Sequence, residues 1–321
     1  MRKDAKTPKT ATLSRVQGYH EGGYSGSVNY AYQGFASNKY FTSDRFIKLD
    51  EHFSRPDGKP LKGFGLEIET ECRGLSNVTI YAEVLQNIIF PHFPADLFKL
   101  QHDGSLGGDT SAECITQVMT REFIRNNYQA FRLMYNTYFP AFHISCSQSG
   151  NCGMHVNISN GCFGRSQAAQ ETAIKKLLYI ANKHYDLCCA LTCRGAHRHY
   201  CARMLRYTTQ EGCKAADLQH MPSSHGNSCN FSHFPEGRIE LRFVGGQKDF
   251  GAFRNTMESI FHLVEAVKTL TWAECDSLEV IFSGCNQYVF DRLNTKCKAA
   301  GTITDAQLAA IRETVKREEL V

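Results

Sequence analysis

Three separate segments of this chain alternate between apolar and polar residues, and this period of two constrains the fold more than any other feature. The segments are residues 63–71, 153–159 and 238–243. Successive side chains of a β-strand point to opposite faces, so the alternation predicts three strands that each have one apolar face.

The polar faces of these predicted strands carry residue types that are typical of reactive sites. They hold Glu67, Glu69 and Glu71 on the first strand, His155 and Asn157 on the second, and Arg238, Glu240 and Arg242 on the third. A solvated strand face more often carries interchangeable Lys, Thr, Ser and Gln, although three solvated faces remain the ordinary alternative. Side chains two residues apart on a strand lie roughly 7 Å apart, from which two carboxylates can converge on one cation.

Helical periodicity fills the sequence between the strands. Apolar residues recur at steps of three and four through residues 124–138 and 253–267, and a helix also fits residues 166–189. Residues 304–307 have the spacing of a capping box and predict a further helix. Strands and helices are mixed without regular βαβ alternation, which predicts an α+β fold with a largely antiparallel sheet.

The chain of 321 residues shows one change of composition near its start. Residues 1–45 are rich in Gly, Ser, Tyr and Asn and lack a sustained apolar period, which predicts a mobile or extended arm. No later linker or internal repeat follows, so residues 46–321 are predicted to form a single domain.

Charge and cysteine content limit which partners and which cellular compartment can be expected. A net charge of +4 from 36 basic and 32 acidic residues favours neither nucleic acid nor a membrane surface as a partner. No run of 18 apolar residues and no apolar leader segment occurs, so the fourteen cysteines are interpreted as reduced thiols. We therefore expect a cytoplasmic protein, and its oligomeric state stays open.

Two further segments supply carboxylates. Asp103 lies in a turn-like segment at residues 100–106, and Glu113 lies in a short predicted strand at residues 110–116. An acid flanked by small and apolar residues, as Glu113 is, would be costly to bury unless it were paired or bound to a metal.

The complete set has the chemistry of a site for a metal-bound nucleotide. Oxygen ligands suited to Mg²⁺ or Mn²⁺ come from Glu67, Glu69, Glu113, Glu240 and Asp103. Donors for phosphate oxygens come from His155, Arg238 and Arg242. The chain contains neither a Walker A sequence nor Gly-x-Gly-x-x-Gly, so the nucleotide would be held through metals and arginines.

These segments, in their order along the chain, resemble the motifs of the amidoligases, which belong to the glutamine synthetase-like carboxylate–amine ligases. The matching stretches are Gly-Leu-Glu-Ile-Glu-Thr at 65–70, His-Asp-Gly-Ser-Leu at 102–106, Ala-Glu-Cys-Ile at 112–115, Cys-Gly-Met-His-Val-Asn at 152–157 and Arg-Ile-Glu-Leu-Arg-Phe at 238–243. The resemblance spans about residues 62–268. Family members often have His-Val-His where this chain has His155-Val156-Asn157, so an amide replaces the second imidazole.

The resemblance implies a fold, cofactors and roles. It implies a curved antiparallel sheet with the site on its concave face, helices packed on the other face, and Mg²⁺ (or Mn²⁺) with ATP as cofactors. An amide bond would form between a carboxylate and an amine through an acyl phosphate. Metal binding is assigned to Glu67, Glu69, Glu113 and Glu240, contacts to ATP to His155, Asn157, Arg238 and Arg242, and catalysis to Asp103, His155, Arg238 and Arg242.

Two other functions stay open, and so do the substrates. The same fold could transfer phosphate to a guanidino or other nitrogen acceptor, or it could serve as a non-catalytic binding or structural protein. The amine and carboxylate substrates, small molecules or peptides, are not specified by the sequence. The Cys/His-rich stretch at residues 188–201 lacks Cys-x-x-Cys and matches no common zinc module, and it is interpreted as buried thiols beside a basic surface formed by Arg194, Arg198, Arg203 and Arg206.

Overall fold

The computed structural model describes residues 62–73, 81, 83–93, 97–101, 111–146, 152–195, 201–221 and 226–316. The predicted N-terminal arm and Asp103 therefore lie outside the described residues.

Seven strands form one sheet in the described part of the chain, and all its strand pairs are antiparallel. The strands are β1 (Phe64–Cys72), β2 (Phe98–Gln101), β3 (Ser111–Thr116), β4 (Ile144–Ser145), β5 (Met154–Ser159), β6 (Cys229–Asn230) and β7 (Arg238–Leu241). Their order is β2-β3-β1-β5-β7-β6, and β4 pairs with the end of β1 beyond β5. The predicted strands of residues 63–71, 110–116 and 153–159 are confirmed as β1, β3 and β5.

The predicted strand of residues 238–243 is two residues too long, because β7 ends at Leu241. The backbone N–H groups of Arg242 and Phe243 both donate to the carbonyl of Ser228, at 2.9 and 3.2 Å. Two consecutive residues thus share one acceptor, which is incompatible with a regular ladder and ends the strand.

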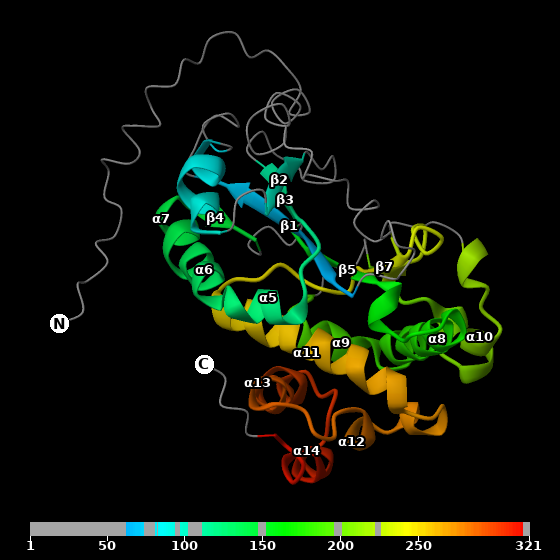
Figure 1. The fold of residues 1–321 in the computed structure, drawn as a ribbon. Helices are drawn as coiled ribbons and strands as arrows, with labels where there is room; N and C mark the ends of the chain where they lie inside the picture. Colours follow the sequence, from blue (N-terminus) through cyan, green and yellow to red (C-terminus); the bar gives the residue numbers. More distant parts are fainter. Residues whose placement is uncertain are drawn as a thin grey trace.

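Helices account for most of the remaining described chain (Figure 1). The α-helices are α5 (Arg121–Asn126), α6 (Tyr128–Leu133), α7 (Phe139–Ala141), α8 (Gln167–Lys183), α9 (Tyr185–Leu191), α10 (Gln210–Lys214), α11 (Phe250–Thr269), α12 (Leu278–Ile281), α13 (Gln287–Arg292) and α14 (Asp305–Arg312). Short π-helical or 3-10 turns are η1 (Leu85–Ile89), η2 (Phe90–His92), η3 (Met134–Tyr138), η4 (Asn160–Cys162), η5 (Leu205–Tyr207), η6 (Leu218–His220), η7 (Ala273–Asp276) and η8 (Leu293–Cys297). The α+β prediction is thereby confirmed at the level of fold class.

The predicted helices are found with two interruptions. The helix expected over residues 124–138 is divided at Asn127, with φ −100° and ψ 11°, into α5 and α6, and its last five residues form the π-helical η3. The helix expected over residues 166–189 is divided into α8 and α9 at His184, whose ψ of 38° departs from helical geometry. The Thr304 capping box is present in α14, with its side chain accepting from the Gln307 backbone.

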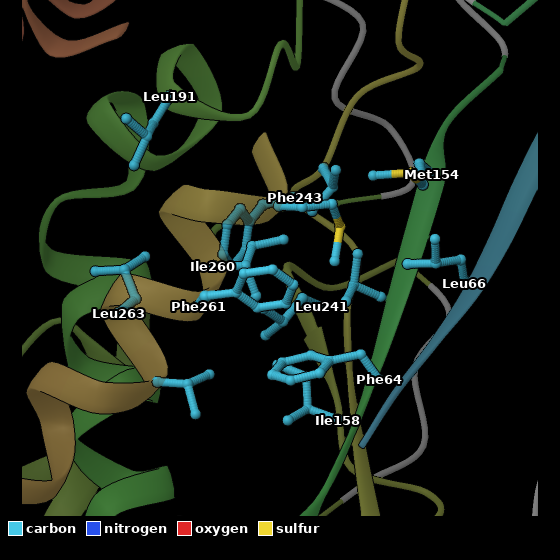
Figure 2. Close-up of a cluster of buried hydrophobic side chains, with 14 of the residues drawn as sticks. Phe64, Leu66, Met154, Ile158, Leu191, Leu241, Phe243, Ile260, Phe261 and Leu263 are labelled. Atoms are coloured by element: carbon cyan, nitrogen blue, oxygen red, sulfur yellow. The ribbon is translucent and has the colours of Figure 1, made fainter. Parts of the chain in front are cut away.

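The apolar face of the sheet packs on α11, which crosses it as the longest described helix (Figure 1). Figure 2 shows Phe64, Ile158 and Leu241 from three strands meeting Ile260 and Phe261 of α11. The rings of Phe64 and Phe261 have centroids 4.8 Å apart. Helices α12 to α14 lie on the side of α11 away from the sheet (Figure 1). Because this face is filled by the core, the acidic and basic side chains of the same strands are displayed on the opposite face.

Candidate functional site

The strand register brings the predicted site residues together on the polar face of the sheet. Glu67 of β1 lies opposite His155 of β5, and Glu69 lies opposite Glu113 of β3. On the other side of β5, Asn157 lies opposite Glu240 of β7. Directly opposed residues in an antiparallel pair have Cβ atoms about 5 Å apart, so these side chains are neighbours.

His155 lies at the centre of this group of carboxylates. Its Nδ1 is 3.1 Å from Glu67 Oε2 and 3.4 Å from Glu240 Oε1, and its Nε2 is 3.5 Å from Glu69 Oε1. The imidazole is buried, with 4% of its surface exposed. Three carboxylates from two different strands therefore surround one ring.

Glu240 is held by two donors, one just after β7 and one on the neighbouring strand β6. Arg242 Nη1 donates to Glu240 Oε1 at 2.5 Å, and Asn230 Nδ2 donates to Glu240 Oε2 at 2.8 Å. The same Arg242 nitrogen lies 3.5 Å from His155 Nδ1. Glu240 thus connects the guanidinium to the imidazole and has a more fixed position than an isolated carboxylate.

Asn157 links the second arginine to the acidic group. Its Nδ2 donates to Glu67 Oε1 at 2.7 Å, while its Oδ1 accepts from Arg238 Nη1. An amide donates and accepts at once, so Asn157 can fix a carboxylate and a guanidinium together. The amide that stands where amidoligases often have a second imidazole is therefore a positioning group in this structure.

The electrostatics of the group favour charged forms of both Glu67 and His155. Burial alone would raise the pKa of Glu67, but its hydrogen bonds to His155 and Asn157 and the charges of His155 and Arg238 lower that pKa to about 2. Burial would likewise lower the pKa of His155, but the Glu67 hydrogen bond and the charges of Glu69 and Glu240 raise it. A protonated imidazole supplies positive charge that stabilises the surrounding carboxylates.

One subset of the group has the geometry of a metal site. Glu67, Glu113 and His155 each offer a ligand atom, and these atoms all lie within 4.8 Å of one another. Ligand atoms on opposite sides of one Mg²⁺ lie about 4.2 Å apart, so small side-chain rotations would close the set around an ion. The resemblance assigns His155 to contacts with ATP, whereas this geometry also makes it a candidate metal ligand.

The backbone immediately before β5 holds Glu69 beside this subset. The Gly153 N–H donates to Glu69 Oε2. A Cβ at position 153 would lie 3.2 Å from that oxygen and 2.7 Å from Arg194 Nη1, so glycine is what allows both side chains to approach the backbone.

The structure thus gathers Glu67, Glu69, Glu113, His155, Asn157, Arg238, Glu240 and Arg242 on one face of the sheet. Sequence analysis did not single out Asn230, which lies opposite Glu240 in the β6–β7 pair. It also grouped Arg194 with surface arginines, yet Arg194 is buried, with 8% of its surface exposed. Its proximity to Gly153 depends on a contact between distant segments, for which the local sequence gives no signal.

The Cys/His-rich stretch is partly described. His197 and His199 lie outside the described residues, while Cys188, Cys189 and Cys201 are buried thiols. All fourteen cysteines are free. A hydrogen bond from Cys189, further hydrogen bonds from Tyr185 and Arg194 and the charge of Arg194 outweigh burial and lower the pKa of Cys201 to about 5.

No protein-family model matches this chain, and no curated protein is detectably similar to it. The resemblance to amidoligases consequently rests on the motifs and stays a prediction. In the described part of the chain, no helix is long and apolar enough to cross a membrane.

Proposed function

We propose that this protein is an ATP- and Mg²⁺-dependent ligase that forms an amide bond between a carboxylate and an amine. The observation that carries the proposal is the meeting of four carboxylates and two guanidinium groups around His155 on the polar face of an antiparallel sheet. The antiparallel order of the strands also supports the proposal that the sheet is of the glutamine synthetase-like kind.

Charge balance supports a divalent cation at this site. Four carboxylates, those of Glu67, Glu69, Glu113 and Glu240, meet three guanidinium groups, those of Arg238, Arg242 and the buried Arg194 beside Glu69, so the acids exceed the guanidinium groups by one when His155 is neutral. Buried carboxylates in excess are costly unless a cation or protons neutralise them. Two carboxylates suit Mg²⁺ or Mn²⁺, and the imidazole is more typical of a transition metal, which makes Mn²⁺ a suitable probe.

Glu67, Glu113 and His155 would hold the ion, with Glu69 beside them. When bound, a divalent cation neutralises charge on the phosphates of ATP and so favours phosphoryl transfer. Arg238 and Arg242 would donate to phosphate oxygens, and their hydrogen bonds to Asn157 and Glu240 fix them in position before a ligand arrives.

The proposed reaction proceeds in two displacements. A carboxylate oxygen of the substrate attacks the γ-phosphorus of ATP, the bond to the β–γ bridging oxygen breaks, and ADP leaves. The amine nitrogen then attacks the acyl carbon, the carbon–oxygen bond to phosphate breaks, phosphate leaves, and the nitrogen loses a proton. Asp103, which the resemblance assigns to catalysis and which would orient or deprotonate the amine, lies outside the described residues.

The test is incubation of the purified protein with Mg-ATP and mixed pools of amines and carboxylates, with nucleotides and new masses read by mass spectrometry. We expect ADP and a condensed product, both lost in the Glu67→Gln/Glu69→Gln variant. ADP with a phosphorylated nitrogen compound would instead identify a phosphotransferase. Intact ATP, together with no Mg²⁺-dependent nucleotide binding by the same sample, would overturn the proposal in favour of a non-catalytic protein.

A further inference from the structure

A cavity of about 490 Å³ lies beside β4, apart from the carboxylate group. Its basic lining residues are Arg73, His143 and Lys248, and its apolar wall includes Tyr135, Phe139 and Ile144. Cavities of about 300 to 1,000 Å³ with a mostly apolar wall and a few convergent polar groups are typical of small-molecule sites.

The cavity adjoins the polar face of the sheet. β4 lines the cavity and pairs with Glu71 and Cys72 at the end of β1. Glu71 is two residues after Glu69 on the same strand, which places it roughly 7 Å further along. The cavity therefore begins where the row of carboxylates on β1 ends.

Shared backbone connects the two places. The cavity residue Gln247 follows Gly246, where a Cβ would lie 1.4 Å from the Cys146 carbonyl oxygen and 3.0 Å from that of Cys152. Only glycine permits this approach. Cys152 in turn precedes Gly153, whose N–H holds Glu69. The wall of the cavity and the support of the carboxylate site are thus built from the same two segments.

The charge of the cavity is opposite to that of its neighbour. None of its described lining residues is acidic. The carboxylate of Asp249 lies 3.6 Å from the Lys248 ammonium, but it also accepts from the Ala252 N–H at 2.7 Å, at the start of α11. A concave surface lined by basic groups raises the local concentration of anions.

The backbone holds two of the basic residues together at some cost. The Arg73 N–H donates to the His143 carbonyl at 3.2 Å. His143 has a φ of 56°, in the left-handed region that residues other than glycine rarely occupy. Such strain is found most often at functional sites, where the surrounding structure enforces it.

The cavity wall also contains an unsatisfied polar group. Tyr135 is 1% exposed, and its hydroxyl has no hydrogen-bond partner among the described residues. The hydroxyl oxygen is closed off from solvent on all sides, so Tyr135 contributes its ring to the cavity wall and no polar contact to a ligand.

From these features we infer that the cavity binds a small organic carboxylate, with the anionic group at Arg73 and Lys248 and the carbon skeleton against Phe139 and Ile144. The basic lining selects an anion, and the apolar wall distinguishes an organic anion from inorganic phosphate. That this carboxylate is the acceptor that the enzyme activates rests on the proposed function. Its binding to the cavity does not.

The test measures binding of glutarate and phenylacetate to the full chain by isothermal titration calorimetry, without ATP or divalent metal. The uncharged amides of both compounds serve as ligand controls. The Arg73→Gln/Lys248→Gln variant should weaken carboxylate binding about ten- to hundredfold, as expected for loss of hydrogen bonds to a charged group. Arg165→Gln/Lys296→Gln removes the same charge from exposed positions away from the cavity and should leave binding unchanged.

The inference would be overturned if neither carboxylate bound at millimolar concentration, or if the two double variants weakened binding equally. Amides that bind as well as the acids would also overturn it, because charge would then not be recognised. This binding test requires neither ATP nor a divalent metal. A protein that binds the carboxylates but forms no amide with Mg-ATP would therefore refute the ligase and leave the cavity assignment intact.

Discussion

Replacing Glu113 by Gln tests whether the carboxylate group is a cation site. Glu113 contributes one of three ligand atoms that lie within 4.8 Å of one another, together with Glu67 and His155. Loss of groups that merely orient metal ligands typically lowers affinity 10- to 100-fold, so loss of a ligand should cost about 100-fold. Glutamine keeps the size of the side chain and removes the charge.

The expected magnitude follows from the linkage between binding and folding. A Mn²⁺ concentration of about 100 times Kd raises the free energy of unfolding by about 2.7 kcal/mol. If Glu113→Gln raises Kd about 100-fold, the same Mn²⁺ concentration stabilises the variant by only about 0.4 kcal/mol. Urea unfolding, with and without Mn²⁺ and with EDTA as the reference state, measures both values.

Glu71→Gln is the matched control, because Glu71 lies on the same strand and outside the three-residue subset. It should keep the full stabilisation by Mn²⁺. In EDTA, Glu113→Gln should lose little stability, since Glu113 lies directly opposite Glu69 and opposed like charges destabilise a sheet. A Glu113→Gln protein that Mn²⁺ stabilises as much as the wild type would refute the assignment of this residue as a ligand.

Three further predictions concern stability. Arg125→Met should lower the free energy of unfolding by about 3–5 kcal/mol in urea, because it leaves the buried carboxylate of Glu258 without its counter-ion; a loss below 1 kcal/mol would contradict this. Burial lowers the pKa of His184 and His262, so the unfolded chain takes up protons at these residues more readily than the folded protein does. The free energy of unfolding should therefore fall as the pH falls below about 6.5. The His184→Gln/His262→Gln variant should show a flatter dependence of the unfolding free energy on pH between about pH 7.5 and 5.5. Thr304→Ala should cost about 1 kcal/mol through loss of the capping box, whereas unchanged thermal unfolding would show that α14 does not unfold with the rest.

The strands that carry the site were predictable because their periodicity is long enough to detect. β1 and β5 have nine and six residues with buried apolar side chains on alternate positions, and α11 has twenty with a continuous apolar face. Burial of one face imposes the pattern on the sequence, so the pattern identifies the element.

The short strands could not be predicted in this way. β4 and β6 have two residues each, and a period of two has no meaning over such a length. They are strands because long-range hydrogen bonds to β1 and β7 make them so. Consequently the sequence predicted neither the position of Asn230 nor the cavity beside β4, both of which depend on these pairings.

The sequence also could not predict which side chains each site residue contacts. Alternation places Glu69 and His155 on polar faces, but register decides which carboxylate meets which base. The chain has no local signal that sets β1 against β3 and β5 in the observed register. The same absence of a signal explains why His155 was assigned to phosphate when its position among Glu67, Glu69 and Glu240 makes it a candidate metal ligand.

Comparison with a second buried charged cluster shows why the carboxylate group is interpreted as functional. Glu258 of α11 accepts from both Nε and Nη2 of Arg125 at 2.8 and 2.5 Å, from the Tyr128 hydroxyl at 2.7 Å and from Asn286 Nδ2 at 2.8 Å. One carboxylate there meets one guanidinium and several neutral donors, which is the composition of a structural ion pair joining helices.

The group around His155 lacks that balance. Its four carboxylates exceed the guanidinium groups of Arg194, Arg238 and Arg242 by one, and they lie on strands of one sheet, where the packing of α11 against the opposite face limits how far they can separate. Folding alone gives little reason to hold four carboxylates so close together, because apolar or neutral residues at these positions would be more stable. Under the proposed function, a divalent cation held by Glu67, Glu113 and His155 would add the positive charge that offsets this excess. Arg125→Met should therefore destabilise the fold without altering Mn²⁺ affinity, whereas Glu113→Gln should do the reverse.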